Sequence, residues 1–316
     1  MTGGLTVGVD VGGTKVLGGV VDEDGTVLAV VRRPTPAGDA RQTARAIADV
    51  VGELDEEHDI EAVGVGAAGW IDVTRSIVLH APNLAWRNEP LRERVEELVH
   101  LPVVVENDAN AAAWAEYRFG VGRGFDQVLL VTVGTGIGGG VVLAGQLYRG
   151  AHGVAAEFGH VRVVPDGRPC GCGDRGCLEQ YASGKALVRE ARAGAQQDPA
   201  VAGALLELAG GDPEKIEGPH VTKAARAGDR VARDAFEVVG GWLGRGLADL
   251  VSAWDPGLLV IGGGVAEAGD QLVTPARVAY AEVMATRGRA HAAEIRVAAM
   301  GNEAGLVGAA DLARVR

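Results

Sequence analysis

The sequence is poor in cysteine and in long apolar runs, and both absences narrow the class of protein. It has three cysteines among 316 residues, an odd number that argues against the disulfide framework of a small secreted domain. No apolar run is long enough for a membrane helix, and Met1 leads into a strand pattern without a signal or transit peptide. We therefore expect a cytoplasmic protein. Its 47% hydrophobic content and 49 glycines are typical of a compact chain with many tight turns.

Positive charge is also scarce. The 30 Lys and Arg residues are outnumbered by 42 Asp and Glu residues, which gives a formal net charge of -12. Nucleic-acid binding requires clustered basic residues that contact phosphates, so we expect no nucleic-acid partner. The sequence contains no G-x-x-x-x-G-K-[ST] motif, which excludes a P-loop. An anionic ligand must therefore be held by local backbone and metal contacts, because the electrostatic field of the net negative charge does not attract it.

All three cysteines lie in one short window, Cys170-Gly-Cys172-Gly-Asp-Arg-Gly-Cys177, which follows His160. Three thiolates and one imidazole are the ligand set of a closed tetrahedral zinc site, and the intervening glycines let a short loop fold back around one ion. The alternative is a disulfide with one spare thiol, but the odd count and the absence of a secretory signal argue against it. We therefore predict a structural zinc site in loop 160–177. The flanking acids, Glu157 and Glu179, are not needed as ligands and are free for another role.

Glycine-rich turns occur at equivalent places in two similar halves of the chain. A strand-like run at 5–10 ends in Gly12-Gly13-Thr14-Lys15 and is followed by a second run at 16–21. Downstream, a run at 127–133 leads into a glycine turn at 134–140 and a strand at 141–143. This pattern indicates a duplication at the scale of a domain, not a short solenoid repeat. Halves of this kind face each other across a cleft, where small ligands bind.

We predict two α/β domains. The first covers residues 1–108 and the second covers residues 109–301, with a C-terminal helix at about 302–316 that packs back on the first domain. Residues 191–220 contain Gly, Pro and charged residues with little periodicity. We interpret them as a variable helical excursion and assign no function to them.

The first glycine turn has the composition of a phosphate-binding loop. Gly12 and Gly13 allow backbone N–H groups to approach phosphate oxygens, and Thr14 and Lys15 add donors. Asp10, at the end of the preceding strand, is suited to a hydrated magnesium ion, which prefers one or two carboxylates together with phosphate oxygens. An ordinary hairpin turn is the alternative, but the second glycine turn favours phosphate binding.

The second glycine turn also satisfies the dinucleotide-binding fingerprint G-x-G-x-x-G at residues 134–139. That fingerprint requires a helix immediately after it. Here an apolar strand at 141–143 and an Ala-Gly turn follow. We therefore reject the dinucleotide-binding interpretation, because a strand stands where the fingerprint requires a helix.

Five motifs together resemble the ROK (repressor, open reading frame, kinase) family. They are Asp10-Val-Gly-Gly-Thr-Lys15, Glu106-Asn-Asp-Ala-Asn110, Thr132-Val-Gly-Thr-Gly-Ile-Gly-Gly-Gly140, Glu157-Phe-Gly-His160 and Cys170-Gly-Cys-Gly-Asp-Arg-Gly-Cys177-Leu-Glu179. The similarity extends from about residue 7 to residue 309, and the zinc segment is its most specific part. Within the family, the sequence most resembles the bacterial ATP-dependent glucokinases.

The resemblance implies the actin/hexokinase-like ATPase fold, with two duplicated ribonuclease H-like α/β halves around a central cleft. It implies that MgATP phosphorylates D-glucose to glucose 6-phosphate, the first step of glucose use. Asp108 matches the catalytic base, although an Asp that follows a strand would also serve as a helix N-cap. The matching sugar contacts are Asn83, Asn107, Asp108, Glu157, His160 and Glu179. Without the resemblance, we would interpret Asn83 as a turn residue. Gly262, Gly263 and Gly264 match the adenosine-binding turn, and Thr14, Thr135 and Gly136 match residues that reach the phosphates.

Three alternatives stay open at this level. The chain could be a ROK kinase for another hexose, such as N-acetylmannosamine, N-acetylglucosamine or fructose, because small changes in pocket shape decide between hexoses. It could use polyphosphate as the donor. It could be a sugar-sensing transcriptional repressor, but repressors of the family carry a helix-turn-helix before the first strand, and only Met1 to Gly4 precede it here. The resemblance also suggests a homodimer or a homotetramer.

Overall fold

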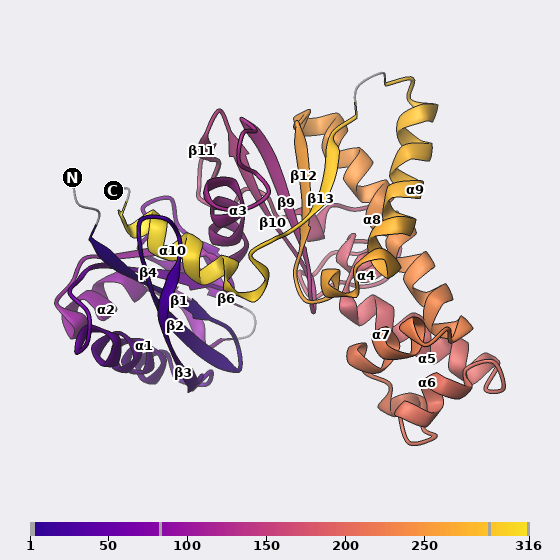
Figure 1. Ribbon diagram of the computed structural model, residues 1–316, viewed down its shortest axis with the longest axis horizontal. Coiled ribbons are helices and arrows are strands. Elements are labelled where there is room, and N and C mark those ends of the chain that lie inside the picture. Colours follow the sequence, from indigo (N-terminus) through magenta and orange to yellow (C-terminus); the bar gives the residue numbers. More distant parts are fainter. Residues whose placement is uncertain (1–3, 82–83, 290–291, 315–316) are drawn as a thin grey trace. The chain divides into compact units, whose positions relative to one another are not determined.

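A computed structural model describes residues 4–81, 84–289 and 292–314 (Figure 1). The chain forms two compact units. Unit 1 contains Met1–Leu130, Gly140–Ala156 and Ala299–Arg316, and unit 2 contains Val131–Gly139 and Glu157–Ala298. Each unit contains more than one stretch of the chain. The domain boundary expected at residue 108 stays a prediction.

A five-stranded sheet with the order β3-β2-β1-β4-β8 is the centre of unit 1 (Figure 1). β2 pairs antiparallel with β1 and with β3, whereas β1, β4 and β8 pair in parallel. The parallel strands are almost wholly buried, as expected for strands that are covered on both faces. The strands are β1 (Leu5–Val11), β2 (Lys15–Val21), β3 (Val27–Pro34), β4 (Ile60–Ala67) and β8 (Val103–Asn107).

The two faces of this sheet pack against helices in different ways. On one face, Val7, Val9 and Val11 share an apolar core with α1 and α2. On the other face, Gly8 and Gly64 lie so close to the backbone of α10 that an added Cβ would collide with one of its carbonyl oxygens. Glycine therefore allows the C-terminal helix to pack directly on the central strands. The helices of unit 1 are α1 (Ala40–Asp55), α2 (Leu91–Val99), α3 (Asp108–Arg118) and α10 (Ala304–Arg314), with a short 3-10 turn η4 (Gly301–Glu303) before α10.

The second five-stranded sheet has the order β11-β10-β9-β12-β13, which repeats the order of the first sheet strand for strand. The predicted duplication is therefore confirmed. The second glycine turn is shorter than predicted, because β10 begins at Ile137 and residues 138–140 lie within the strand. Gly140 packs against α3, where an added Cβ would lie 2.8 Å from the Ala109 carbonyl oxygen, so close packing explains this glycine better than a turn. The strands are β9 (Gln127–Val133), β10 (Ile137–Leu143), β11 (Gln146–Leu147), β12 (Leu258–Gly262) and β13 (Glu294–Val297).

Helices make up most of unit 2. The longest, α8, packs along α9, and Gly240 and Gly244 let the two backbones approach closely. The predicted helical excursion at 191–220 is confirmed, since it contains the end of α5, all of α6 and the start of α7. The helices are α4 (Glu179–Ala182), α5 (Gly184–Gln197), α6 (Gly203–Leu208), α7 (Gly218–Arg226), α8 (Arg230–Trp254) and α9 (Asp270–Thr286), with 3-10 turns η1 (Phe158–His160), η2 (Pro213–Lys215) and η3 (Ala266–Ala268).

A small antiparallel sheet in unit 1 contains β5 (Trp70–Ile71), β6 (Val78–Ala81) and β7 (Trp86–Glu89). Asn83, a predicted sugar contact between β6 and β7, lies outside the described residues. Among the helices that the structure describes, none combines the length and the apolar character needed to cross a membrane.

Candidate functional site

Two predicted functional acids, Asp10 and Asp108, lie at the same edge of the first sheet. Asp10 is the penultimate residue of β1, and Asp108 directly follows β8. Because β1, β4 and β8 run parallel, their carboxyl ends meet at one edge, where ligands of open α/β sheets bind. Gly305 in α10 is close to both residues, since an added Cβ would lie 3.7 Å from Asp10 Oδ1 and 3.9 Å from the Asp108 carbonyl oxygen. The fold therefore brings together two acids that are distant in sequence.

Asp108 is the first residue of α3 and not its N-cap. The N-cap is Asn107, whose Oδ1 accepts a hydrogen bond from Asn110 N at 3.0 Å. Asp108 Oδ1 accepts one from Ala109 N at 2.9 Å. The interpretation of Asp108 as a capping residue is thus wrong, because the residue before it fills that role. Asn107 also donates from Nδ2 to the Gly69 carbonyl at 3.0 Å, which leaves one N–H and one lone pair of its amide for other partners.

The first glycine turn is closed by a hydrogen bond from Gly12 N to the Lys15 carbonyl oxygen at 3.0 Å. Gly13 and Thr14 are exposed at its tip. An added Cβ on Gly12 would meet only the Lys15 oxygen, at 3.7 Å, so packing within the protein does not require this glycine. Burial raises the pKa of Asp10, and the nearby positive charge of Lys15 partly offsets that rise. A further cation beside Asp10 would stabilise its ionised form.

The second glycine turn, at residues 134–136, joins two other parts of unit 2. Gly134 N donates to the Gly136 carbonyl at 2.9 Å, and the Gly134 carbonyl accepts from Gly184 N at 2.8 Å, at the start of α5. Val265 N donates to the Val133 carbonyl at 2.9 Å, which fixes the loop after β12 to the same place. The predicted phosphate turn and the predicted adenosine turn are therefore neighbours.

A cavity of about 1370 Å³ opens beside these two turns. Thr135 and Gly264 line it, whereas Gly262 ends β12 and Gly263 turns the chain with a φ of +84°. Most of its wall comes from α5, α7 and the segment between them. The lining residues are Gly134, Thr135, Gly184, Lys185, Leu187, Val188, Arg189, Arg192, Ala193, Gln196, Glu214, Gly218, Pro219, Thr222, Lys223, Arg226, Gly264, Val265, Glu267 and Ala268.

The helical part of this wall contains none of the predicted site residues. A signal was present, since Lys185, Arg189 and Arg192 recur at helical spacing and share one face of α5. Together with Lys223 and Arg226 they make the wall locally basic in an acidic chain. Among the described residues, Lys185 and Lys223 form no ion pair, so their charge is available to an anionic ligand.

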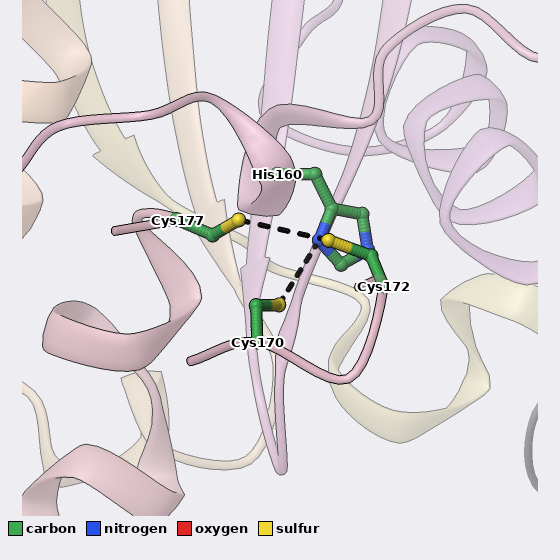
Figure 2. A group of neighbouring side chains, drawn as sticks. All are labelled: His160, Cys170, Cys172 and Cys177. Carbon is green, nitrogen blue, oxygen red and sulfur yellow. Dashed lines mark hydrogen bonds between the residues drawn. The ribbon is translucent and has the colours of Figure 1, made fainter. Parts of the chain in front are cut away.

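The predicted metal ligands come together in unit 2. His160, Cys170, Cys172 and Cys177 place one ligand atom each within 4.8 Å of all the others. Figure 2 shows the three sulfurs around the Nδ1 atom of the imidazole. Cys170 Sγ lies 3.6 Å from His160 Nδ1, and Cys172 Sγ lies 3.7 Å from Cys177 Sγ. These four residues can hold a metal ion.

The protonation of the thiols depends strongly on such an ion. Burial, followed by hydrogen bonds with the neighbouring sulfurs, raises the pKa of Cys177 to about 12. Burial also raises the pKa of Cys170. A bound cation reverses this preference, because metal binding displaces the thiol proton.

The two flanking acids stay next to this cluster. Glu157 Oε2 lies 3.9 Å from His160 Nε2, the ring nitrogen that faces away from the sulfurs. Glu179 Oε1 accepts from Cys170 Sγ at 3.1 Å. The other oxygen of Glu179 is close to the glycine turn, since an added Cβ on Gly136 would lie 2.6 Å from it. Glu179 therefore lies between Cys170 and the second glycine turn, and Glu157 lies beside His160.

Comparisons with known proteins agree with the similarity noted above. The profile of the ROK family matches residues 6–316. The glucokinase of Streptomyces coelicolor is 51% identical over 315 residues, which cover 98% of both chains. The solved structure of a ROK family glucokinase from Streptomyces griseus in complex with glucose and AMPPNP is 53% identical, with a TM-score of 0.92, and covers 99% of this chain and 100% of that chain. A ROK hexokinase from Thermus thermophilus is 37% identical, with a TM-score of 0.82 and 98% coverage of both chains.

Proposed function

Because the chain belongs to the ROK family, we propose that it transfers the γ-phosphoryl group of ATP to the 6-hydroxyl group of D-glucose. The observation that carries this proposal is the similarity, over nearly the whole chain, to the Streptomyces griseus glucokinase solved with glucose and AMPPNP. The glucokinases of Streptomyces coelicolor and Thermotoga maritima, 51% and 38% identical, support the same activity.

In this reaction Asp108 acts as the general base. The 6-hydroxyl oxygen of glucose forms a bond to the γ-phosphorus, the bond from that phosphorus to the β–γ bridging oxygen breaks, and the hydroxyl proton passes to Asp108. Phosphoryl transfer has a loose transition state, so a carboxylate that accepts the proton late is sufficient. Its place as the first residue of α3 favours the ionised form that a base requires, since a helix N-terminus stabilises negative charge.

The nucleotide would occupy the cavity of unit 2. Apolar residues such as Val188 and Val265 suit the adenine ring, and the second glycine turn, through Thr135 and Gly136, suits the phosphates. The unpaired cation of Lys185, at the start of α5, is placed to attract the same phosphates.

Magnesium would accompany the nucleotide, and Asp10 is the residue suited to hold it. Its carboxylate is held at the carboxyl edge of the first sheet, and burial makes its charge costly without a cation nearby. A magnesium ion there would screen the phosphate charges. The first glycine turn, Gly12 to Lys15, supplies donors beside it.

Zinc fits the cluster of His160 and the three cysteines. Tetrahedral bonds of about 2.3 Å to sulfur and about 2.0 Å to nitrogen place two sulfurs about 3.8 Å apart and a sulfur about 3.5 Å from a nitrogen. The separations of 3.7 Å and 3.6 Å in this protein agree with those values. Four protein ligands close the coordination shell, so the zinc would be structural and would hold loop 160–177.

The sugar would be bound by groups that these elements position. Zinc on Nδ1 of His160 leaves Nε2 to interact with Glu157 or a hydroxyl group. Glu179, Asn107 and Asn83 are the further sugar contacts that the family resemblance implies. Carboxylates and amides at a sugar site select a substrate by hydrogen bonding to its hydroxyls.

The proposal is tested by a coupled assay of ADP release with ATP and a panel of sugars. We expect the highest kcat/KM with D-glucose and lower values with N-acetylmannosamine, N-acetylglucosamine and fructose. Formation of glucose 6-phosphate with polyphosphate in place of ATP is measured in a separate arm and should be slow. A higher kcat/KM for another sugar, or no ADP release above the sugar-free background, would overturn the proposal.

We also propose a cellular location and an oligomeric state. We expect it to act in the cytoplasm and to assemble as a homodimer or homotetramer, and sedimentation of the purified protein would test its assembly.

A further inference from the structure

A carboxylate with no assigned role, Glu106, is buried two residues before the proposed base. Its residue is 1% exposed. Burying a carboxylate is costly unless both oxygens are paired. Glu106 meets this condition, because each of its oxygens contacts two groups of unit 1, and the two oxygens face different parts of the chain.

One oxygen holds the residues on both sides of Asp108. Glu106 Oε1 accepts from the backbone N of Asn107 at 2.9 Å and from Asn110 Nδ2 at 3.1 Å. The first contact fixes the peptide group between Glu106 and Asn107, and the second holds a side chain in the first turn of α3. The backbone just before Asp108 and a side chain just after it are therefore tied to a single carboxylate.

The other oxygen connects Glu106 to two arginines. Glu106 Oε2 lies 2.7 Å from Arg149 Nε and 3.1 Å from Arg75 Nε. Arg149 is itself buried, and its terminal nitrogens donate to the carbonyl oxygens of Val73 and Asp72, each at 2.9 Å. Three separate segments, around residues 72–75, 106–110 and 149, thus meet at one carboxylate.

We propose that Glu106, fixed by Arg149, is a positioning residue that sets the place of the Asp108 carboxylate during phosphoryl transfer. This inference rests on the proposed function, because it assumes that Asp108 is the base. A base must be aligned with the hydroxyl group, and a misplacement of about 1 Å costs about 100-fold in rate. Glu106 provides this alignment through its contacts with Asn107 and Asn110 and is not itself among the proposed substrate contacts.

The test is Glu106→Gln, with steady-state kinetics against ATP and glucose. The amide can still accept from Asn107 N, but its NH2 group would face two guanidinium groups, which are also donors. We expect kcat to fall about 100-fold, while the KM for ATP, whose cavity lies in unit 2, stays within about twofold of the wild type. Arg149→Lys keeps the charge but cannot bond both carbonyls, and it should give the same pattern with a smaller loss.

The matched control is Glu116→Gln, on the same helix as Asp108. Glu116 is also fully buried, and its two oxygens accept from Met300 N at 2.8 Å and Val121 N at 3.1 Å, so it has a structural role away from the acids. It should lower the melting temperature and leave kcat within about threefold. Equal losses of kcat in both Gln variants, or near wild-type kcat in Glu106→Gln, would overturn the inference. If Glu106→Gln does not fold, Arg149→Lys is judged by the same criterion.

These outcomes differ from a failure of the proposed function. If the wild type does not phosphorylate glucose, the proposed function itself fails. If the wild type is active, Asp108→Asn is inactive and Glu106→Gln retains its kcat, only the positioning role of Glu106 fails.

Discussion

The two sheets of this protein have the same strand order, but their glycine turns carry different side chains. When Gly12 is matched with Gly134, Asp10 corresponds to Thr132 and Lys15 to Ile137. The first turn therefore has an acid and a cation at these two positions of its own sequence, whereas the second has an uncharged residue at each. The repeated topology places a turn at each sheet edge, and the side chains next to the turn decide whether it suits a metal ion or only phosphate and sugar groups.

Packing around the two turns also differs. The first turn is open, since an added Cβ on Gly12 would touch only one oxygen of its own turn. The second is enclosed by Glu179 and by the start of α5. Packing within the protein therefore accounts for glycine at position 136 of the second turn but not at position 12 of the first.

Among the variants that test this comparison, Asp108→Asn should lower kcat the most, because it removes the only proposed proton acceptor. We expect kcat to fall about 1000-fold, since a general base contributes about 100- to 10,000-fold. Glucose binding, measured by titration calorimetry, should persist because the amide is isosteric. A variant with near-normal kcat would remove Asp108 from its role as the base.

Asp10→Asn tests whether the acid of the first turn serves a cation. If Asp10 holds magnesium through water, kcat/KM for MgATP should fall about 10- to 100-fold. The free energy of unfolding of this variant should rise, although its activity falls. Burial raises the pKa of Asp10 above its ordinary value of 3.8, so its ionisation costs the native state stability as the pH rises through that range.

The Asn variant should therefore be more stable than the wild type at pH 7, and this difference should shrink as the pH falls toward 3.8 and be absent below that value. Thermal unfolding at several pH values measures it. A variant that is less stable at pH 7 but converges at low pH would show that Asp10 is stabilised as an anion, contrary to this assignment.

Loss of the zinc ligand in Cys172→Ser should disturb the second turn and leave the first intact. We expect the zinc content to fall and the KM for glucose to rise about tenfold or more, because loop 160–177 carries His160 and borders Glu179. Asp174→Asn is the matched control, since Asp174 lies in the same loop and its exposed side chain contacts Arg162 and the backbone N of Arg175, which are not metal ligands. Unchanged glucose affinity after zinc removal would contradict the structural role of the metal at the sugar site.

The smallest effects are expected from alanine in the two turns. Gly136→Ala would place its Cβ 2.6 Å from a Glu179 oxygen, so Glu179 must move and the KM for glucose should rise about fivefold. Gly12→Ala meets no such obstacle and should alter only the KM for MgATP. The comparison of the turns is wrong if Gly12→Ala raises the KM for glucose more than Gly136→Ala does.

Much of the fold could be predicted from sequence. The strand runs, the two glycine turns and the clustering of His160 with the three cysteines follow from patterns within short segments, and the structure confirms them. The predicted length of the second turn was wrong, because residues 138–140 lie within β10. Gly140 packs closely against α3, and the sequence pattern does not distinguish this use of glycine from a turn.

The cavity of unit 2 shows why other features could not be predicted. Its wall combines α5 with residues 214–226 and 264–268, and no local pattern indicates that these segments face one space. The same is true of Glu106, whose partners Arg75 and Arg149 are distant from it in sequence and look like ordinary surface arginines.

The sequence by itself determined the metal ligand set, the family and the chemistry available at each strand end, because these depend on residue types at short, fixed spacing. The tertiary structure decided that Asn107 caps α3 in place of Asp108, that Glu106 joins three segments, and that basic helices enclose a cavity. Such contacts depend on strand register and on helix packing between distant segments, and those are set only when the whole chain buries its apolar faces.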